Sequence, residues 1–113
     1  MELSLILPVH NQADIIELVY KHILTTLKKL GISYECILVE NGSTDNTKSV
    51  VFRLAKTYPN THALTAPKGY GSAVLTGLTK ATGKYICYMP SDGQIDLSVF
   101  PELWRLTKTG HWD

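Results

Sequence analysis

The sequence is poor in cysteine, and its two cysteines are widely separated. Cys36 and Cys87 form no C-x-x-C pair, and each falls inside an apolar stretch that predicts a strand. Zinc sites and small disulfide frameworks need closely spaced or more numerous cysteines. We therefore expect two buried free thiols in a reducing compartment, and neither a disulfide nor a cysteine-bound metal.

The sequence also lacks an excess of charge of either sign and any long hydrophobic run. Its 11 basic and 10 acidic residues are scattered, and the formal net charge is +1. Such a balance disfavours binding to nucleic acid or to an anionic membrane. No apolar stretch approaches the roughly 18 residues of a membrane span, and Leu3 to Val9 has no basic leader of the signal-peptide kind. We expect a cytoplasmic protein, and any helices that attach a full-length form to a membrane would lie past residue 113.

Glycine-rich phosphate loops are missing as well. A Rossmann dinucleotide site needs G-x-G-x-x-G after the first strand, where this sequence has Pro8-Val9-His10-Asn11-Gln12. A Walker A loop is absent, and a receiver-type phosphoacceptor would need acidic residues after an early strand. If the protein binds a nucleotide, it does so through other side chains.

What the sequence does contain is an alternation of strand and helix patterns. Short apolar runs without two-residue alternation, typical of buried parallel strands, are Leu3 to Val9 and Tyr34 to Val39, with a weaker strand near His62 to Thr65 and a fourth at Lys84 to Met89. Between them lie helical repeats, with apolar faces predicted at Ile15, Leu18, Val19, His22, Thr26, Leu27 and Leu30, at Val51, Leu54, Ala55 and Tyr58, and at Tyr70, Ala73, Val74, Gly77, Leu78 and Ala81. The second helix should begin at Ser43-Thr44-Asp45, and a last helix is expected over Leu97 to Leu106.

This alternation predicts an α/β fold with a parallel sheet covered on both faces. The 113 residues, 44% of them hydrophobic, fit one domain with a single core. The chain ends after the fourth strand with no helix stop beyond Gly110. We therefore expect residues 1–113 to be the front part of a larger domain.

Polar residues follow each predicted strand, at the edge where open α/β sheets bind ligands. The four segments are Pro8 to Gln12, Glu40 to Asp45, Ala66 to Gly71 and Met89 to Gln94. Pro8 and Asn11 could equally be punctuation between a strand and a helix, and Asp45 is better suited to a helix cap than to a ligand.

Two side chains in these segments carry charge suited to a nucleotide. Lys68, before a Gly-x-Gly turn, could hold an anion at the helix start or could be an ordinary solvated lysine. Asp92 has the hard oxygen atoms that suit a divalent cation completed by phosphate and water, although Asp-Gly is also a common turn pair.

Taken in order, these segments resemble the family 2 glycosyltransferases, and the likeness covers nearly the whole chain. L-I-L-P-V-H-N-Q corresponds to the opening P-x-x-N-E segment, and I-L-V-E-N-G-S-T-D to V-D-D-G-S-T-D. P-K-G-Y-G-S-A-V-L-T-G corresponds to R-G-x-G-x-A-x-x-x-G, and P-S-D-G-Q to D-A-D-x-Q. The resemblance implies the Rossmann-like GT-A fold, a three-layer sandwich with a mostly parallel sheet in strand order 3-2-1-4, cut before the acceptor half. The sequence is similar to polyprenyl- and dolichyl-phosphate sugar synthases.

The resemblance also implies an activity and a site. Members transfer a sugar with inversion from a nucleotide-diphosphate donor, such as a UDP- or GDP-sugar, with Mg²⁺ or Mn²⁺. The implied donor-binding residues are Pro8, Val9 and Asn11 at the base, Glu40 and Asn41 at base and ribose, Lys68 and Gly69 along the nucleotide, and Ser91 beside the metal-binding Asp92. The general base would lie beyond residue 113, so the chain should bind nucleotide without turnover.

Three positions depart from the family pattern. Gln12 replaces a glutamate, Asn41 replaces the second aspartate, and Pro90 replaces the first acid of D-x-D. Asp92 would then hold the metal with phosphate oxygens and water.

Two other classes remain open. A noncatalytic nucleotide-binding or regulatory module would suit the altered acidic motif. A nucleotidyltransferase-like enzyme normally has a basic, Gly-rich loop after its first strand, which Pro8 to Gln12 does not match. The sheet edge left uncovered near the fourth strand also predicts a homodimer.

Overall fold

The computed structural model describes residues 2–89 and consists of four strands and three helices in strict alternation. In chain order these are β1 (Leu3–Val9), α1 (Ile16–Leu30), β2 (Tyr34–Asn41), α2 (Thr47–Thr57), β3 (Thr61–Ala66), α3 (Tyr70–Leu78) and β4 (Tyr85–Tyr88). All described strand pairs are parallel, and the order is β3-β2-β1-β4. The predicted α/β class and strand order are confirmed, while the helix expected over Leu97 to Leu106 lies outside the described residues.

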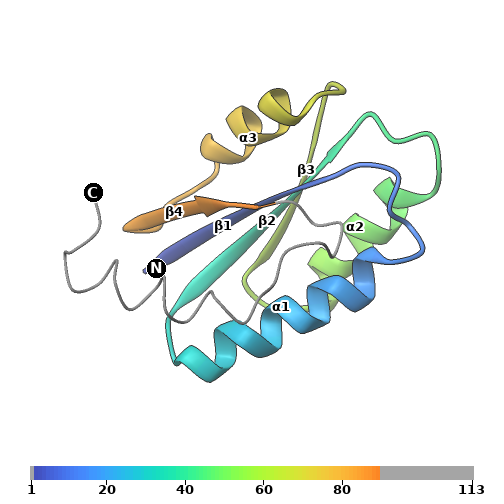
Figure 1. The fold of residues 1–113 in the computed structure, drawn as a ribbon. Helices are drawn as coiled ribbons and strands as arrows, with labels where there is room; N and C mark the ends of the chain where they lie inside the picture. The colour runs from blue at the N-terminus through green and yellow to red at the C-terminus, as the bar shows by residue number, and fades with distance from the viewer. Residues whose placement is uncertain (1, 90–113) are drawn as a thin grey trace.

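The sheet lies between two helical layers (Figure 1), with α1 and α2 on one face and α3 on the other. Neighbouring side chains of a strand point to opposite faces. Leu5, Leu7 and Leu38 therefore join the core cluster under α1 and α2, and Ile6 and Ile37 join the smaller one under α3. Every residue of β1 and β2 is buried, which explains why their sequences show no alternation.

The predicted face of α1 was correct only in part, because Leu27 is buried and Val19 and Leu30 pack against the core. The buried residues are Ile16, Tyr20, Ile23, Leu24 and Leu27, whereas Leu18 is 76% exposed and Ile15 is exposed. Both sets satisfy helical spacing, and the observed face buries the larger apolar set. As expected, the helix ends at Gly31, whose φ of 66° is the left-handed conformation typical of a C-cap glycine.

Tyr20 anchors α1 on the far strand β3. Its hydroxyl lies 2.6 Å from Thr61 Oγ1, and both residues are buried. Thr61 Oγ1 donates to the carbonyl of Pro59 at 3.2 Å, so the Tyr20 hydroxyl is the donor. Burial raises the pKa of Tyr20, and the group stays protonated.

Replacing Tyr20 with phenylalanine should lower the free energy of unfolding by about 1 kcal/mol, because Thr61 Oγ1 loses a buried donor. Urea denaturation followed by circular dichroism measures the change. Tyr58, whose ring packs edge-on against Tyr20 at 5.8 Å, provides the control. Tyr58→Phe keeps that ring and should cost less; an equal or larger loss would contradict the proposed role of the Tyr20 hydroxyl.

Several predicted element boundaries differ: β2 extends to Asn41, and β3 spans Thr61–Ala66. α2 begins at Thr47 after Asn46 rather than at Ser43-Thr44-Asp45, because those three residues form hydrogen bonds with the loop that follows β1. β4 spans Tyr85–Tyr88, shorter than the expected Lys84 to Met89. Both cysteines are free, as expected; Cys36 is buried, which raises its pKa to about 12, and Cys87 is half-buried.

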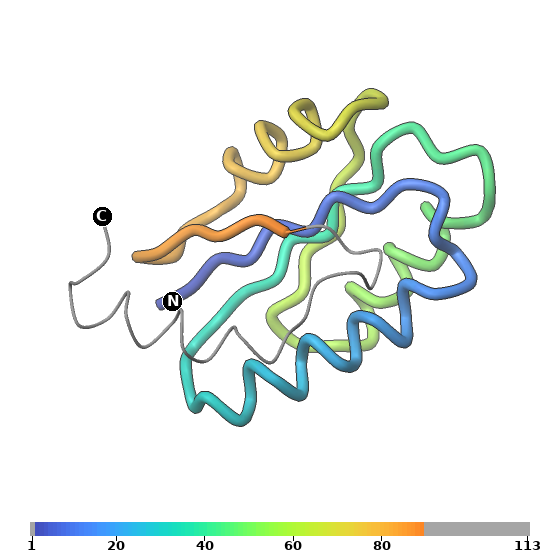
Figure 2. The backbone as a smooth tube through the Cα atoms, viewed as in Figure 1, coloured from blue at the N-terminus to red at the C-terminus, as the bar shows by residue number. Residues whose placement is uncertain are grey.

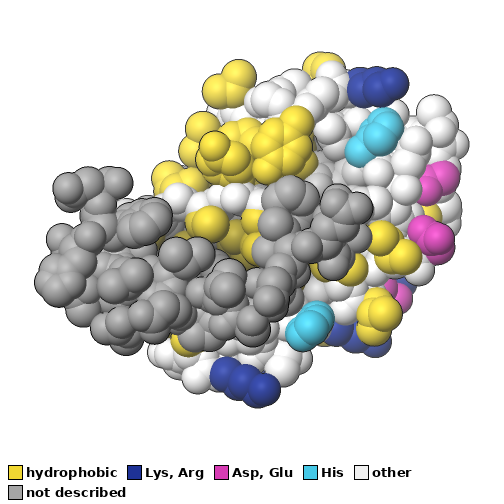
Figure 3. Space-filling model, viewed as in Figure 1, with side chains coloured by type: hydrophobic (Ala, Val, Ile, Leu, Met, Phe, Trp, Pro, Cys, Tyr) yellow, Lys and Arg dark blue, Asp and Glu magenta, His cyan; other side chains and the backbone are white. Residues whose placement is uncertain are grey.

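Large apolar side chains are exposed on α3 and β4. Figure 3 shows hydrophobic side chains gathered over this part of the molecule; they include Tyr70, Leu75, Leu78, Ile86 and Tyr88. The homodimer expected at the β4 edge stays a prediction. Within residues 2–89, no helix is both long enough and apolar enough to cross a membrane.

Candidate functional site

Three of the four predicted site segments meet at the carboxyl edge of the sheet. Val9 pairs with Glu40, and Asn41 pairs with Ala66, so β1, β2 and β3 end at nearly the same level. The loops that follow them gather at one end of the molecule (Figure 2). Pro8 and Val9, the last two residues of β1, therefore lie at the edge where the sequence placed them.

Asn11 joins the first loop to the second. Its backbone N–H donates to Ser43 Oγ at 3.0 Å, and its Oδ1 accepts the backbone N–H of Thr44 at 2.8 Å. Its φ of 50° lies in the left-handed region, which asparagine tolerates better than most residues. The backbone N–H of Gln12 donates to Thr47 Oγ1, at the start of α2, at 2.8 Å, and that of Ala13 donates to Asp45 Oδ2 in the second loop at 3.3 Å.

Asp45 was expected to be the helix cap; it lies one residue before the N-cap Asn46 but still binds the first residue of α2. One carboxylate oxygen accepts both the hydroxyl and, at 2.9 Å, the backbone N–H of Thr47, while the other accepts the N–H of Ala13. These hydrogen bonds, the one from the Thr47 hydroxyl above all, hold the pKa of Asp45 below its usual value. Asp45 thus fixes the start of α2 and the first loop together.

His10 is a site residue that the sequence reading missed. Its Nδ1 lies 2.8 Å from the backbone carbonyl of Asn41, and its Nε2 lies 3.3 Å from Asn11 Nδ2. Because a carbonyl only accepts, Nδ1 carries the proton, and Nε2 of the neutral ring accepts from the amide. The signal in the sequence was a histidine directly after the first strand, but its partner is 31 residues away.

Glu40 and Asn41 are both 5% exposed at the end of β2. Glu40 Oε2 accepts the backbone N–H of Ser43 at 2.5 Å, which fixes the carboxylate at the mouth of the second loop. Asn41 Nδ2 donates to the backbone carbonyl of Gly69 at 3.1 Å. Asn41 therefore attaches the third loop to the second.

Lys68 and Gly69 lie where the third loop enters α3. Gly69 has a φ of 128°, a region that favours glycine, and α3 has no side-chain cap. Lys68 is exposed. A positive side chain beside a helix N-terminus with free N–H groups is suited to an anion such as a phosphate.

The fourth predicted segment, with Ser91 and Asp92, lies outside residues 2–89. Within those residues, no group of three or more histidine, cysteine, aspartate or glutamate side chains could hold a metal ion. That Asp92 binds Mg²⁺ or Mn²⁺ therefore stays a prediction.

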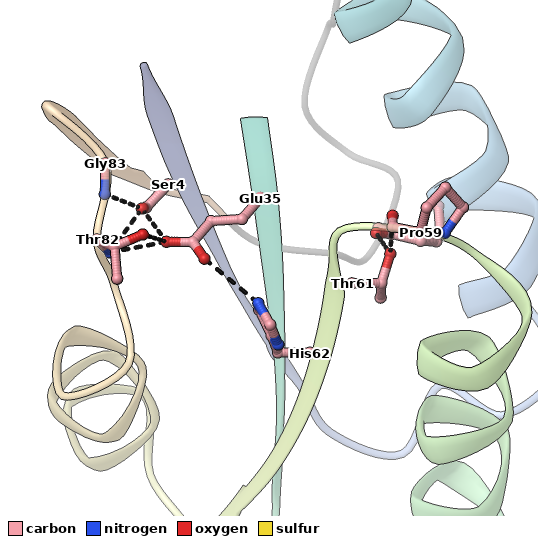
Figure 4. Close-up of polar contacts among 8 residues, drawn as sticks. Ser4, Glu35, Pro59, Thr61, His62, Thr82 and Gly83 are labelled. Carbon is pink, nitrogen blue, oxygen red and sulfur yellow. Dashed lines mark hydrogen bonds and ion pairs between the residues drawn. The ribbon is translucent and has the colours of Figure 1, made fainter. Parts of the chain in front are cut away.

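A second polar cluster, not predicted from the sequence, lies toward the amino end of the sheet (Figure 4). Glu35 is 4% exposed, and its Oε2 accepts the Ser4 hydroxyl at 2.5 Å and the Thr82 N–H at 2.7 Å. His62 Nε2 lies 3.3 Å from its Oε1, and the Gly83 N–H donates to Ser4 Oγ at 2.7 Å. Burial alone would raise the pKa of Glu35, but the hydrogen bonds from Ser4 and Thr82, with His62 nearby, lower it overall.

Solved structures of other proteins share this fold. The S. aureus TarS 1-349 structure superposes with a TM-score of 0.71 and 22% identity, over 98% of this chain and 33% of that one. A mannosyltransferase from Pyrobaculum calidifontis, solved with GDP-Man and Mn²⁺, has a TM-score of 0.62 and 28% identity, over 80% of this chain and 27% of that one.

Curated proteins are also similar to this chain in sequence. A dolichol-phosphate mannosyltransferase of Pyrococcus furiosus is 32% identical over 111 residues, which are 97% of this chain and 31% of the relative. A dolichyl-phosphate beta-glucosyltransferase of Trichomonas vaginalis is 30% identical over 114 residues, 95% of this chain and 35% of the relative. The chain thus spans about a third of the length of these relatives. Its residues 4–111 match the family described as Glycosyl transferase family 2, and the chain, with its Rossmann-like GT-A architecture, belongs to that family.

Proposed function

We propose that residues 1–113 form the nucleotide-sugar-binding part of a metal-assisted, inverting glycosyltransferase. The observation that carries the proposal is the joining of three loops at one sheet edge by the side chains of Asn11 and Asn41. That joining brings Pro8, Val9, Glu40, Lys68 and Gly69 to one edge, where parallel α/β sheets take their ligands.

Each part of this edge suits a different part of a nucleotide-diphosphate sugar. Pro8, Val9 and Asn11 supply one wall for the base, and Glu40 and Asn41 supply acceptors for a base N–H or a ribose hydroxyl. Lys68, Gly69 and the start of α3 supply positive charge and backbone donors for the diphosphate. Ser91 and Asp92 would complete the site beside the diphosphate.

The proposed reaction is a direct displacement at the anomeric carbon. The oxygen of the acceptor forms the new bond as the bond to the diphosphate breaks, and a general base takes the acceptor proton. When bound at Asp92, Mg²⁺ or Mn²⁺ would offset the charge gathering on the leaving diphosphate. The role of Lys68 and of the α3 N-terminus is to hold that diphosphate. The names of the curated relatives suggest that the acceptor is a polyprenyl phosphate. The full-length protein would then act at a membrane surface.

Thermal unfolding in the presence of UDP, GDP and CDP, each with and without Mn²⁺, tests the proposal. A ligand that binds only the folded state at a hundred times its Kd adds about 2.7 kcal/mol to the free energy of unfolding. We expect UDP or GDP to raise Tm, Mn²⁺ to add to the rise, and Asp92→Asn to lose the Mn²⁺ increment. Glu17→Gln, on the outer side of α1, is the matched control and should keep it.

Two outcomes would overturn this proposal in different ways. If none of the three nucleotides raised Tm, the edge would not be a nucleotide site. If UDP or GDP raised Tm equally with and without Mn²⁺, the chain would be a noncatalytic nucleotide-binding module, a class that Pro90 in place of an acidic residue favours.

A further inference from the structure

We propose that Asn41 is a positioning residue, which sets the place of the Lys68–Gly69 turn and thereby of the α3 N-terminus. This inference rests on the proposed function, because the turn matters only if the edge holds a nucleotide. The proposed role of Asn41 is structural and is separate from any contact with a base or ribose.

The first observation is that the amide of Asn41 is already engaged. Its Nδ2 donates to the Gly69 carbonyl, while its Oδ1 is buried and has no hydrogen-bond partner within residues 2–89. A buried polar atom without a partner costs free energy. The amide is therefore held in this orientation for the bond that it makes to the third loop.

The second observation is steric and comes from the next residue. A Cβ atom at Gly42 would lie 2.9 Å from Lys68 Cβ and 3.1 Å from Lys68 Cα, so the backbone of the second loop packs directly on Lys68. Gly42 also has a φ of 74°. Asn41 and Gly42 thus hold adjacent residues of the third loop, one by a hydrogen bond and the other by close packing.

The third observation is that Asn41 also forms a hydrogen bond with the first loop. Its backbone carbonyl accepts from His10 Nδ1, while its side chain donates to Gly69. Asn41 therefore contacts both the first and the third loop. A change in its side chain would loosen the third loop and leave the tie between the first two in place.

The chemistry demands a donor at position 41. An aspartate has nearly the same shape, but its carboxylate would face the Gly69 carbonyl with no proton to donate. Only the protonated acid could restore the hydrogen bond. Burial at position 41 beside Glu40 would raise the pKa of the introduced acid, so the defect of Asn41→Asp should lessen as the pH falls toward 5. The titratable groups around this position are Glu40 on β2, His10 from the first loop and Lys68 from the third, and the wild type shares all of them.

The test uses Asn41→Asp, Asn41→Ala and the control Asn46→Asp, which changes an exposed asparagine of the same loop without a side-chain cap bond. Hydrogen exchange of residues 68–73 in the free protein and UDP or GDP affinity by calorimetry are measured at pH 7.5 and pH 5. We expect Asn41→Asp to speed exchange and weaken affinity about tenfold at pH 7.5, and to recover at pH 5 relative to wild type. Asn41→Ala should stay impaired at both pH values, and Asn46→Asp should match wild type.

Unchanged exchange and affinity in Asn41→Asp and Asn41→Ala would overturn the positioning role. Equal impairment of Asn41→Asp at both pH values would overturn the donor requirement. If the wild type binds no nucleotide, the proposed function fails while the exchange data still decide the role of Asn41. Should the Asn41 variants not fold, Gly42→Ala tests the same contact from its other side, with faster exchange of residues 68–73 expected and unchanged exchange contradicting it.

Discussion

Replacing Glu35 with alanine is expected to lower the free energy of unfolding by about 3 kcal/mol, because it removes the common acceptor of a buried cluster. The fully buried Ser4 would keep a donor with no carboxylate to receive it, which costs about 1–3 kcal/mol. The exposed Thr82 would lose two further hydrogen bonds. The segment Thr82–Gly83 before β4 would lose its attachment to β2. Urea denaturation of the variant and wild type measures the difference.

The same carboxylate predicts how stability depends on pH. Its pKa is lower in the folded protein than its usual value, so the unfolded chain takes up the proton first as the pH falls. The stabilisation from Glu35 is therefore full above the usual pKa of glutamate and is lost as the pH falls through the folded-state pKa. Glu35→Gln should flatten this acid limb. The control is Glu17→Gln, which alters an exposed carboxylate paired with Arg53. Solvent screens that pair, so this variant should change the acid limb less than Glu35→Gln does. An acid limb unchanged by Glu35→Gln would contradict the prediction.

Replacing Gly77 with alanine is expected to destabilise the fold by about 2 kcal/mol through overpacking. A Cβ atom there would lie 2.5 Å from Ile6 Cγ2, and Ile6 is fully buried on the central strand β1. α3 would have to move off the sheet to make room. The urea midpoint measures the loss.

Gly71 on the same helix supplies the matched control, because a Cβ atom there would have no neighbour within 4 Å. Gly71→Ala should leave stability unchanged or slightly higher, since alanine favours helix more than glycine does. Equal losses in the two variants would mean that helix flexibility, and not the contact with Ile6, accounts for the effect.

The parts of the fold that were predictable are those encoded by local patterns. Apolar runs and helical repeats gave the alternation of strands and helices, and the family likeness gave the strand order. The face of α1 was only partly predictable, because Leu18 and Tyr20 both fit an apolar repeat. Contacts with distant parts of the chain, such as the hydrogen bond to Thr61 41 residues away, favour Tyr20. Likewise, the start of α2 moved because Asn11 binds Thr44 from another loop.

The candidate site was predictable as a location but not as a network. Residues that end strands were placed at one edge correctly, whereas the tasks of His10 and Asn41 depend on which backbone atoms other loops bring near them. The position of Glu35 in the sequence could have predicted the second polar cluster. An acid within a strand predicted to be buried on both faces must have hydrogen-bond donors around it, though the sequence does not say which ones.

The central place of β1 has a consequence for how the chain acquires its structure. Leu3 pairs with Tyr34 on one side and with Tyr85 on the other. Of the described strands, β1 is thus made first, and it gains β4 as a neighbour only after residues 85–88 have been made. Contacts so distant along the chain form slowly. Until β4 has been made, one edge of β1 has no β4 strand to pair with. During that interval the nascent chain can pair wrongly with other strands.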